Sequence, residues 1–360
     1  MNFQKKDGMN YAPKSGIVKK VVEENEFVFS AVSLKHGHIY GMTNGLIEAG
    51  ATLKYVYDDD PELVKKFVST YPQAIIATSL EEVLNDTETK LIAAADVTNR
   101  RATLGALVMR HHKDYFTDKA PATTLNDIEL IRKTVEETKQ KYFVYYSERL
   151  HVEGSVFAGD LIKQGAIGKV IQVVGLGPHR LNKPTRPDWF FEKEKYGGIL
   201  CDIGSHQIEQ FLYFAGSDNA TVISSKIANY NNPDYPELDD FGDCTLVCDN
   251  GVSCYFRVDW FTPDGLSTWG DGRLIIIGTE GYLEVRKYVD VSKDAKGDNV
   301  YLVNKDGEFY YNVNGKVGFP FFGEMILDCI NRTEKSMTQE HIIKAAELAV
   351  IAQNKAIKIK

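Results

Sequence analysis

An acid and an imidazole stand four residues apart in the stretch 196–207, and this spacing is the most informative feature of the chain. Asp202 and His206 follow the flexible pair Gly197 and Gly198. If the segment is helical, side chains four residues apart lie on one face, one turn from each other. An imidazole that is oriented by a carboxylate can take a proton from an alcohol. An isolated pair of this kind is more often a surface pair on an amphipathic helix, so its surroundings must decide.

The first half of the chain alternates short apolar segments with helical patterns. This regular alternation predicts an α/β fold with an open, doubly wound parallel sheet that is covered on both faces. Ligands bind such a sheet at the carboxyl ends of its strands, so the loops after Ser33, Tyr57, Ala95 and Thr117 should surround one crevice. Strands are expected at 26–33, 52–57, 74–77, 90–95, 115–117 and 142–146, and helices at 61–67, 79–84, 99–110 and 125–139, with a further helix ending near 48.

Strand patterns dominate the second half and are broken by turn residues. They predict an α+β domain built on a large, mostly antiparallel open sheet, with the helix of Asp202 and His206 set against it. Two helices, 323–331 and 339–358, should end the chain. The expected strands are 170–175, 220–230, 244–248, 253–260, 273–278, 282–286, 299–303 and 309–313.

The length of 360 residues exceeds one ordinary core, so two domains are expected. We predict an N-terminal arm at 1–25 and a Rossmann dinucleotide-binding domain at 26–148. A substrate-binding and oligomerisation domain should occupy 149–360. The broad second sheet favours a homodimer or homotetramer that forms through its apolar face.

The composition of the chain limits which partners it is expected to bind and in which compartment it is expected to lie. A formal net charge of −8 argues against a nucleic-acid partner, because phosphates need a basic face. No apolar run is long enough to span a bilayer, and the N-terminus shows no secretory signal. Five cysteines make no disulfide framework at this length, so we predict a cytoplasmic protein. Cys244, Cys248 and Cys254 could suggest a metal, but buried thiols on strands are commoner.

The loop after the first expected strand is where a dinucleotide fingerprint G-x-G-x-x-G would stand. It reads Ser33-Leu34-Lys35-His36-Gly37-His38, so only Gly37 could let a pyrophosphate approach the backbone, while Lys35 adds positive charge. Asp58 ends the second strand, where an acid binds ribose hydroxyls and repels a 2′-phosphate. This favours NAD over NADP, although Asp58 could instead cap the next helix.

Five further side chains complete the predicted cofactor site. They are Ser33, His36, His38, Asn99 and Lys119, of which Asn99 begins the helix after the fourth strand. His36 and His38 could suggest a metal, but no third ligand is visible in the sequence. We therefore predict no metal and assign both imidazoles to the solvent or the phosphates.

Four motifs occur in the order found in one enzyme family, and they are Asp118-Lys119-Ala120-Pro121, Leu161–Gly168, Gly197–His206 and Gly278-Thr279-Glu280-Gly281. They resemble, in turn, an E-K-P motif, a helix ending in G-x-I-G, a G-G-x-x-x-D-x-x-x-H motif and a G-T-x-G turn. The chain resembles the glucose–fructose oxidoreductase, inositol dehydrogenase and rhizopine-catabolism (Gfo/Idh/MocA) family of NAD(P)-dependent sugar oxidoreductases. The resemblance runs from about Glu26 to the last helix.

The resemblance implies that Lys119, Asp202 and His206 form the catalytic group. His206 would be the base, Asp202 would orient the base or the substrate, and Lys119 would stabilise the developing alkoxide. A solvated lysine at a strand end is the alternative for Lys119. The chain departs from the family in its glycine-poor loop and in Ala120, which precedes the proline of the lysine motif.

Candidate substrate contacts lie in two places: after the last Rossmann strand, and just upstream of the two glycines. An aromatic ring beside multidentate donors suits a sugar, and ordinary loop packing is an equal alternative. The candidates are Arg149, His151, His179, Arg180, Arg186 and Trp189.

Three functions compete. The leading one is an NAD-dependent dehydrogenase or reductase that acts on a secondary hydroxyl of a sugar or cyclic polyol. The second is an NAD-dependent glycosidase that oxidises C3 transiently, eliminates the glycoside and retains its cofactor. The third is a nucleotide-binding regulator without chemistry, which would not need Lys119, Asp202 and His206 together.

Overall fold

The computed structural model describes residues 7–293 and 296–359, so the first part of the expected arm, 1–6, lies outside the described residues. The chain forms two compact units that do not follow its linear order. The parallel-sheet unit consists of residues 9–145 and 319–343. The large-sheet unit consists of the described residues among 1–8, 146–318 and 344–360.

The parallel-sheet unit contains a six-stranded sheet with the strand order β3-β2-β1-β4-β5-β6. All its neighbouring strands are parallel, which confirms the predicted Rossmann-type sheet. Every residue of β1 and β5 is buried, as expected for inner strands covered on both faces, and every residue of the edge strand β6 is buried too. The strands are β1 (Val28–Val32), β2 (Thr52–Tyr57), β3 (Ile75–Ile76), β4 (Thr89–Ala94), β5 (Asp114–Asp118) and β6 (Tyr142–Tyr145).

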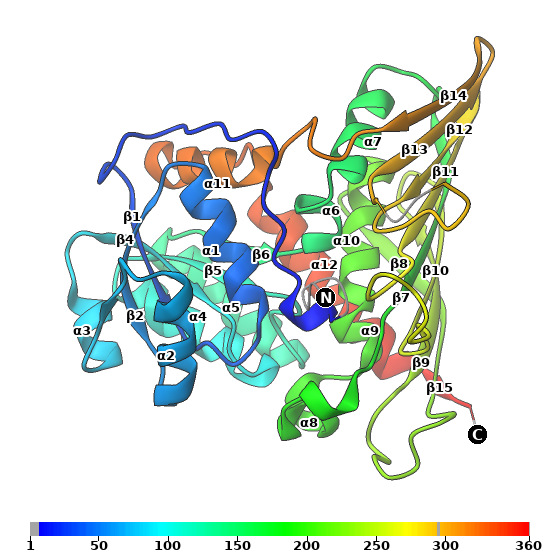
Figure 1. Cartoon of the computed structure of the whole chain (residues 1–360). Coiled ribbons are helices and arrows are strands. Elements are labelled where there is room, and N and C mark those ends of the chain that lie inside the picture. The colour runs from blue at the N-terminus through cyan, green and yellow to red at the C-terminus, as the bar shows by residue number, and fades with distance from the viewer. Residues whose placement is uncertain (1–6, 294–295, 360) are drawn as a thin grey trace. The chain divides into compact units, whose positions relative to one another are not determined.

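Helices connect these strands by crossovers, and Figure 1 shows α1 and α2 on the near side of the sheet. Pro61 stands in the first turn of α2, and the Asp60 side chain caps that turn by accepting from the Glu62 N–H at 2.9 Å. Thr124 and Asp127 form a capping box at the start of α5. The helices are α1 (His38–Glu48), α2 (Pro61–Thr70), α3 (Leu80–Asn85), α4 (Arg101–Arg110), α5 (Leu125–Thr138) and α11 (Pro320–Asn331), with the 3-10 turns η2 (Gly8–Asn10) and η3 (Thr98–Arg100).

The large-sheet unit contains nine strands in the order β14-β13-β12-β11-β7-β10-β9-β8-β15. Only the pairs β7–β10 and β8–β15 are parallel among these described strands, so the predicted mostly antiparallel sheet is confirmed. The strands are β7 (Val170–Pro178), β8 (Ala220–Ala228), β9 (Phe241–Cys248), β10 (Ser253–Asp259), β11 (Arg273–Gly278), β12 (Gly281–Arg286), β13 (Asn299–Asn304), β14 (Gly307–Asn312) and β15 (Ile357–Lys358).

Helices of this unit cover one face of the large sheet. α10 packs against β7 and β10, while α7 packs against β12 and β13, and Figure 1 shows both helices on the same side. The last helix ends at Lys355 rather than at 358, because Ile357 and Lys358 pair with β8. The helices are α6 (Ser147–Leu150), α7 (Glu153–Lys163), α8 (Lys193–Tyr196), α9 (Ile199–Asp202), α10 (Gly204–Ala215) and α12 (Gln339–Lys355), with the 3-10 turns η4 (Lys183–Thr185) and η5 (Asp188–Phe191). The first residues of α12, 339–343, belong to the parallel-sheet unit.

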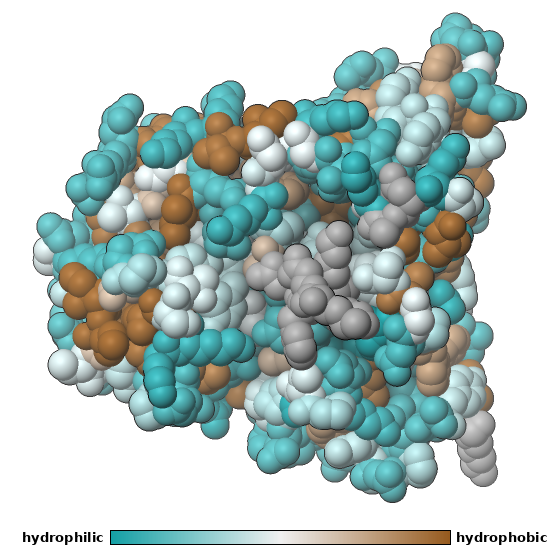
Figure 2. Space-filling view, in the orientation of Figure 1, coloured by the Kyte–Doolittle hydropathy of each residue, from teal (hydrophilic) through white to brown (hydrophobic). Residues whose placement is uncertain are grey.

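Hydrophilic side chains dominate the face of the molecule in Figure 2, and hydrophobic side chains form separate groups on it. Within the described residues, no helix combines the length and the apolar character that crossing a bilayer requires.

Candidate functional site

The carboxyl edge of the parallel sheet gathers the loops to which a cofactor was assigned. Ser33 follows β1 and bridges its neighbours, because its N–H donates to the Tyr57 carbonyl oxygen and its own carbonyl accepts from the Ala95 N–H, both at 3.0 Å. Asn99 follows β4, and Lys119 follows β5. The Lys119–Ala120 peptide bond is cis. Parallel strands end at one edge, so these residues share the side of the sheet where ligands bind.

Asp58, at the end of β2, is a buried acceptor rather than a helix cap. Its Oδ2 accepts from the Leu34 N–H at 2.6 Å, and its Oδ1 accepts from the Asp60 N–H at 2.8 Å and from Lys35 Nζ at 2.6 Å. The cap of α2 is Asp60, so the alternative role considered for Asp58 is wrong. Burial raises the pKa of Asp58, although Lys35 opposes the shift. The carboxylate thus fastens the loop after β1 to β2.

His36 and His38 face an acid that the sequence reasoning did not connect with them. His36 Nδ1 lies 3.1 Å from Asp118 Oδ2, and His38 Nδ1 lies 2.8 Å from Asp118 Oδ1. These three residues are buried, and their ligand atoms are close enough together to hold a metal ion. Asp118 Oδ2 also accepts from Arg101 at 3.1 Å, so a fixed cation already balances the carboxylate. We call His36, His38, Arg101 and Asp118 the buried His–Asp cluster.

The electrostatics of the buried His–Asp cluster depend on the two histidines and on Arg101. Burial raises the pKa of Asp118, but the interactions with His38, Arg101 and His36 outweigh burial and hold that pKa well below its usual range. Burial lowers the pKa of His36 well below its usual value, against the opposing pull of Asp118. Asp118 is therefore ionised and His36 neutral near pH 7.

The N-terminal segment lies directly against Gly37. A Cβ atom at Gly37 would clash with the Met9 carbonyl oxygen and would lie 2.6 Å from Asn10 Oδ1. Gly37 has an ordinary helical φ of −66°, so backbone strain does not explain why a glycine stands at this position. The closeness of the N-terminal segment explains it. Sequence reasoning assigned that close approach to a pyrophosphate.

A pocket of about 530 Å³ adjoins Asn99 at the end of β4. Asn99 Oδ1 is buried and has no hydrogen-bond partner among the described residues, so it remains available to a ligand. Burial also raises the pKa of the nearby Asp96. The pocket is lined by Asp96, Asn99, Arg100, Thr103, Leu104, Ala106, Leu107, Arg110 and Leu130.

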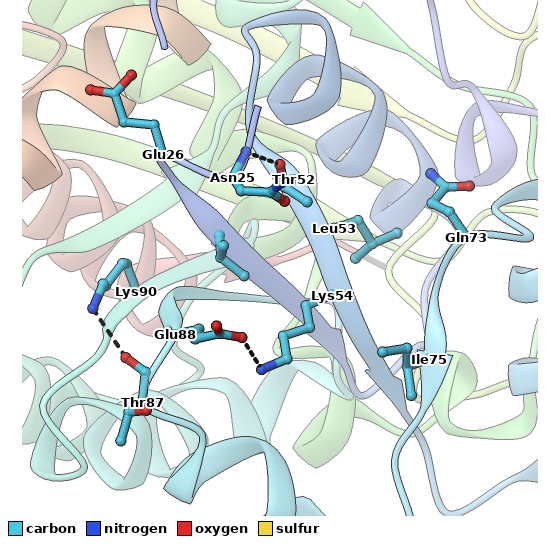
Figure 3. A pocket seen from close by; sticks show the side chains of 11 residues that line it. Asn25, Glu26, Thr52, Leu53, Lys54, Gln73, Ile75, Thr87, Glu88 and Lys90 are labelled. Carbon is cyan, nitrogen blue, oxygen red and sulfur yellow. Dashed lines mark hydrogen bonds and ion pairs between the residues drawn. The ribbon is translucent and has the colours of Figure 1, made fainter. Parts of the chain in front are cut away.

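A second pocket, of about 460 Å³, lies at the opposite edge of the sheet (Figure 3). Its lining includes Glu26 before β1, Thr52 at the start of β2 and Glu88 before β4. Lys54 reaches Glu88 there at 2.5 Å, and the Asn25 N–H donates to Thr52 Oγ1 at 2.9 Å. Cofactors bind doubly wound sheets at the carboxyl ends of the strands, so this pocket does not belong to the candidate cofactor site.

Asp202 and His206 belong to the large-sheet unit, and the helix expected to carry both is interrupted. Asp202 ends α9, His206 lies in the first turn of α10, and Ile203 separates the two helices. The His206 N–H donates to the Ile203 carbonyl at 3.2 Å, while the Asp202 carbonyl accepts from the Ser205 hydroxyl at 3.0 Å. A tightened turn thus replaces the regular helical bond between them.

The two glycines upstream have local structural reasons. Gly197 ends α8 with a φ of +87°, and Gly198 follows with a φ of +91°, a left-handed conformation that other residues rarely adopt. A Cβ atom at Gly198 would also clash with the side chain of Gln353, whose Oε1 accepts from the Leu200 N–H at 2.9 Å. Gln353 therefore anchors the start of α9.

A carboxylate that the sequence reasoning missed lies near His206. Glu148 is 2% exposed, and its Oε2 accepts from Lys287 Nζ at 2.8 Å and from Gln207 Nε2 at 2.9 Å. Its Oε1 lies 3.8 Å from His179 Nε2. No sequence motif connects Glu148 with Lys287, because 139 residues separate them.

The arginines proposed as substrate contacts are already engaged. Arg149 Nε donates to the Glu209 carboxylate at 2.8 Å, and its guanidinium lies 4.0 Å from the Tyr213 ring centroid. Arg180 donates to two backbone carbonyls. Arg186 donates to the Leu181 carbonyl oxygen at 2.9 Å.

Arg186 lies over two aromatic rings, 4.7 Å from the centroid of Phe190 and 4.9 Å from that of Trp260. Burial lowers its pKa, and an Asp7 carboxylate oxygen lies 3.9 Å away. Burial and these ring contacts hold the guanidinium in place.

The other proposed substrate contacts differ in their surroundings. The His179 ring centroid lies 4.5 Å from that of Trp269, a tryptophan that the sequence reasoning did not single out. His151 is buried, and Trp189 is half-buried in η5, with its ring centroid 6.0 Å from that of Phe190. His179 therefore lies in an aromatic setting of the kind expected for a sugar site.

A family model matches part of the chain, and one solved structure is similar to nearly all of it. The model described as the GFO/IDH/MocA C-terminal domain matches residues 157–284. The crystal structure of a "putative oxidoreductase" from Erwinia carotovora atroseptica is 50% identical in sequence, with a TM-score of 0.90. That match covers 93% of this chain and 100% of the other. The chain belongs to the Gfo/Idh/MocA family.

Two further proteins are similar to this chain, one over part of its sequence and the other in its fold. A D-xylose dehydrogenase from Paenarthrobacter nicotinovorans is 27% identical over 149 residues, which are 40% of this chain and 38% of that relative. The matched segment therefore spans well under half of the curated relative. Levoglucosan dehydrogenase in complex with NADH has a TM-score of 0.74 at 15% identity and covers 92% of this chain and 98% of its own. At this identity the likeness concerns the fold alone.

Proposed function

We propose that this protein is a nicotinamide-dependent oxidoreductase that acts on a secondary hydroxyl of a sugar or cyclic polyol. The observation that carries the proposal is the strand order β3-β2-β1-β4-β5-β6 in a Gfo/Idh/MocA family member, because this order creates the crevice in which dinucleotides bind. The names of two relatives, a D-xylose dehydrogenase and a levoglucosan dehydrogenase, motivate the substrate class.

The carboxyl edge of the parallel sheet fits the adenosine end of a dinucleotide. Asp58 accepts three hydrogen bonds, and a carboxylate offers about four acceptor positions, so one is left for a ribose hydroxyl. Asn99 Oδ1 and its pocket offer a second polar contact. The Asp58 carboxylate favours NAD over NADP, since a 2′-phosphate beside it would be repelled. Near the phosphates, Met9 and Asn10 would line the site at Gly37.

The chain's own residues supply proton handling and charge stabilisation. A bound nicotinamide would supply the acceptor for hydride. In the proposed reaction, His206 accepts the proton of the substrate hydroxyl, and Asp202 orients the hydroxyl or the imidazole. Lys119 donates to the oxygen as negative charge develops on it. The backbone position of His206 is set by its place in the first turn of α10.

The decisive experiment compares the purified protein with His206→Asn. The protein should bind NADH and should reduce NAD in the presence of one member of a panel containing D-xylose, levoglucosan and myo-inositol. His206→Asn should lower kcat/KM by about 10²- to 10⁴-fold, as expected for a lost acid–base group, and should leave NADH binding unchanged. His112→Asn is the matched control, because His112 is exposed and its positive φ suits asparagine.

Two outcomes would contradict the proposal. Cleavage of aryl glycosides without net NADH formation would identify the NAD-dependent glycosidase instead. NADH binding without turnover of any sugar or glycoside, unaffected by His206→Asn, would favour the nucleotide-binding regulator.

A further inference from the structure

Glu148 is a buried carboxylate whose hydrogen bonds leave one oxygen turned to an imidazole. Lys287 and Gln207, which are 1% and 0% exposed, both donate to Oε2. Oε1 has no hydrogen-bond partner among the described residues, and it lies 3.8 Å from His179 Nε2. A buried carboxylate oxygen without a donor is costly, so this arrangement needs an explanation beyond the Lys287 ion pair.

The same network holds the helical turn of His206. Gln210 Nε2 donates to the His206 carbonyl oxygen at 2.8 Å, and Gln210 Oε1 accepts from Lys287 Nζ at 2.7 Å. Lys287 therefore binds Glu148 and the α10 turn at once. Gln207, the other donor to Glu148, is the residue next to His206 in the chain. Movement of Glu148 would consequently displace the backbone that carries His206.

Charges in this network favour an ionised Glu148. Burial raises the pKa of Glu148, but the charges of Lys287, His206 and His179 lower it to about 2. The interaction is mutual, so a negative Glu148 must favour the protonated forms of both histidines. Burial lowers the pKa of Lys287, and Glu148 opposes that shift.

The remaining charged neighbours do not replace Glu148. Glu209 acts on Lys287 and on Tyr146, whose ring centroid lies 6.4 Å from that of His206. However, Glu209 is bound by two nitrogens of Arg149, which balance its charge. Glu148 pairs with the single cation Lys287 through Oε2, and its other oxygen lies 3.8 Å from His179 Nε2.

We propose that Glu148 is a positioning residue for the acid–base step: its carboxylate, held by Lys287 and Gln207, stabilises the protonated forms of His206 and His179. The inference rests on the proposed function for its catalytic consequence, because His206 is the proposed base. His179, beside Trp269, becomes a second imidazole that can hold a proton next to the substrate.

Histidine titration by NMR tests this proposal without cofactor or substrate. The eight histidines would be labelled, and the signals of His179 and His206 would be assigned with His179→Asn and His206→Asn. Glu148→Gln preserves size and removes the charge. Its expected effect is a fall of both titration midpoints, by about 1 to 3 pH units, while the other histidines stay unchanged.

Glu153→Gln is the matched control. Glu153 is a buried carboxylate that accepts from the backbone N–H groups of Val317, at 2.9 Å, and Gly318, at 2.5 Å, and among the described residues it forms no hydrogen bond or ion pair with a histidine. Its substitution should cost stability and leave the titrations of His179 and His206 unchanged. Glu148→Asp keeps the charge and shortens the side chain by one methylene. It should lower the titration midpoints of His179 and His206, but by less than Glu148→Gln does. If Glu148→Gln does not fold, the midpoints measured in Glu148→Asp test the proposal.

Unchanged midpoints in a folded Glu148→Gln or Glu148→Asp would overturn the inference. In an active enzyme, the acid limb of the pH profile of kcat/KM should move to lower pH in Glu148→Gln, whereas a purely structural role would lower activity equally at all pH values. If no sugar is turned over but the midpoints shift, the proposed function fails and the electrostatic role of Glu148 stands.

Discussion

Individual buried carboxylates in this protein are held by buried cations from other elements of the same unit. Asp118 is bound by Arg101 in one unit, and Glu148 is bound by Lys287 in the other. Removing one member of a buried pair leaves an uncompensated charge, which costs far more than the pair itself contributes. These positions should therefore be the most sensitive to single substitutions.

Arg101→Met should lower the free energy of unfolding by about 3–5 kcal/mol, because Asp118 would stay buried without its fixed cation. Urea unfolding measures the effect. Arg110→Met is the matched control in the same helix, since Arg110 forms a half-exposed pair with Glu137 at 3.4 Å and should change stability by less than about 1 kcal/mol. Equal unfolding midpoints for the two variants would contradict the role of Arg101 as the cation that compensates Asp118.

The stability difference between the wild-type protein and Glu148→Gln should depend on pH. The folded-state pKa of Glu148, about 2, lies below its usual value of 4.5, so the ionised carboxylate stabilises the folded state above about pH 4.5. That contribution should disappear as the pH falls from 4.5 to 2, which reduces the difference by about 3 kcal/mol. Urea unfolding at several pH values measures it. A constant difference would be inconsistent with an ionised Glu148, and the exposed Glu62→Gln serves as control.

Single elements are defined by short-range signals, but their ends depend on contacts. The start of α1 illustrates this, because its glycine is required by η2 and not by its own dihedral angles. The break between α9 and α10 is a second example, since the tightened turn at Ile203 interrupts a segment whose pattern predicted one helix. Element boundaries therefore report on tertiary neighbours.

Gly37→Ala should displace η2 from the start of α1, because the added methyl group would clash with Met9 and lie 2.6 Å from Asn10 Oδ1. The expected cost is about 1–3 kcal/mol, as for other overpacked sites. Hydrogen exchange should accelerate at residues 9–12 and remain slow in β1 and β4. Gly265→Ala is the control, since a Cβ atom there meets nothing within 4 Å. Unchanged exchange at residues 9–12 would show that the segment does not rest on Gly37.

At the scale of the whole molecule, large apolar side chains stay exposed on several strands of the large sheet. Helices of the large-sheet unit cover one face of that sheet (Figure 1). Exposed apolar groups on such a surface favour self-association, and a symmetric oligomer is the usual result. The exposed residues are Ile171, Ile223, Val247, Tyr282, Phe309 and Tyr310.

We predict a homodimer or homotetramer that forms through the large sheet. Ile223→Asp should lower the mass measured by light scattering, because Ile223 is 60% exposed on β8 and a charge there would oppose burial. Ile75→Asp is the matched control, since Ile75 is 53% exposed on β3 of the other sheet and its substitution should leave the mass unchanged. A monomeric wild-type protein would refute the prediction.

The sequence alone predicted both sheets and the family, because these follow from signals that are local in the chain. Alternating apolar strands and helices indicated the parallel sheet, and the motif at Gly197–His206 indicated the Gfo/Idh/MocA family. The end of β2 was also predicted correctly, and this placed Asp58 at the carboxyl edge of the sheet.

Only the tertiary structure showed what surrounds the predicted residues. It brought Asp118 to His38 across 80 residues, and Lys287 to Glu148 across 139. It also set the N-terminal segment against Gly37. Hydrophobic periodicity determines which segments become helices or strands, but it holds no information on which distant polar groups meet once those segments pack. The candidate acid–base residue His206 was visible in the sequence, and the buried ion pair of Glu148 and Lys287 was not.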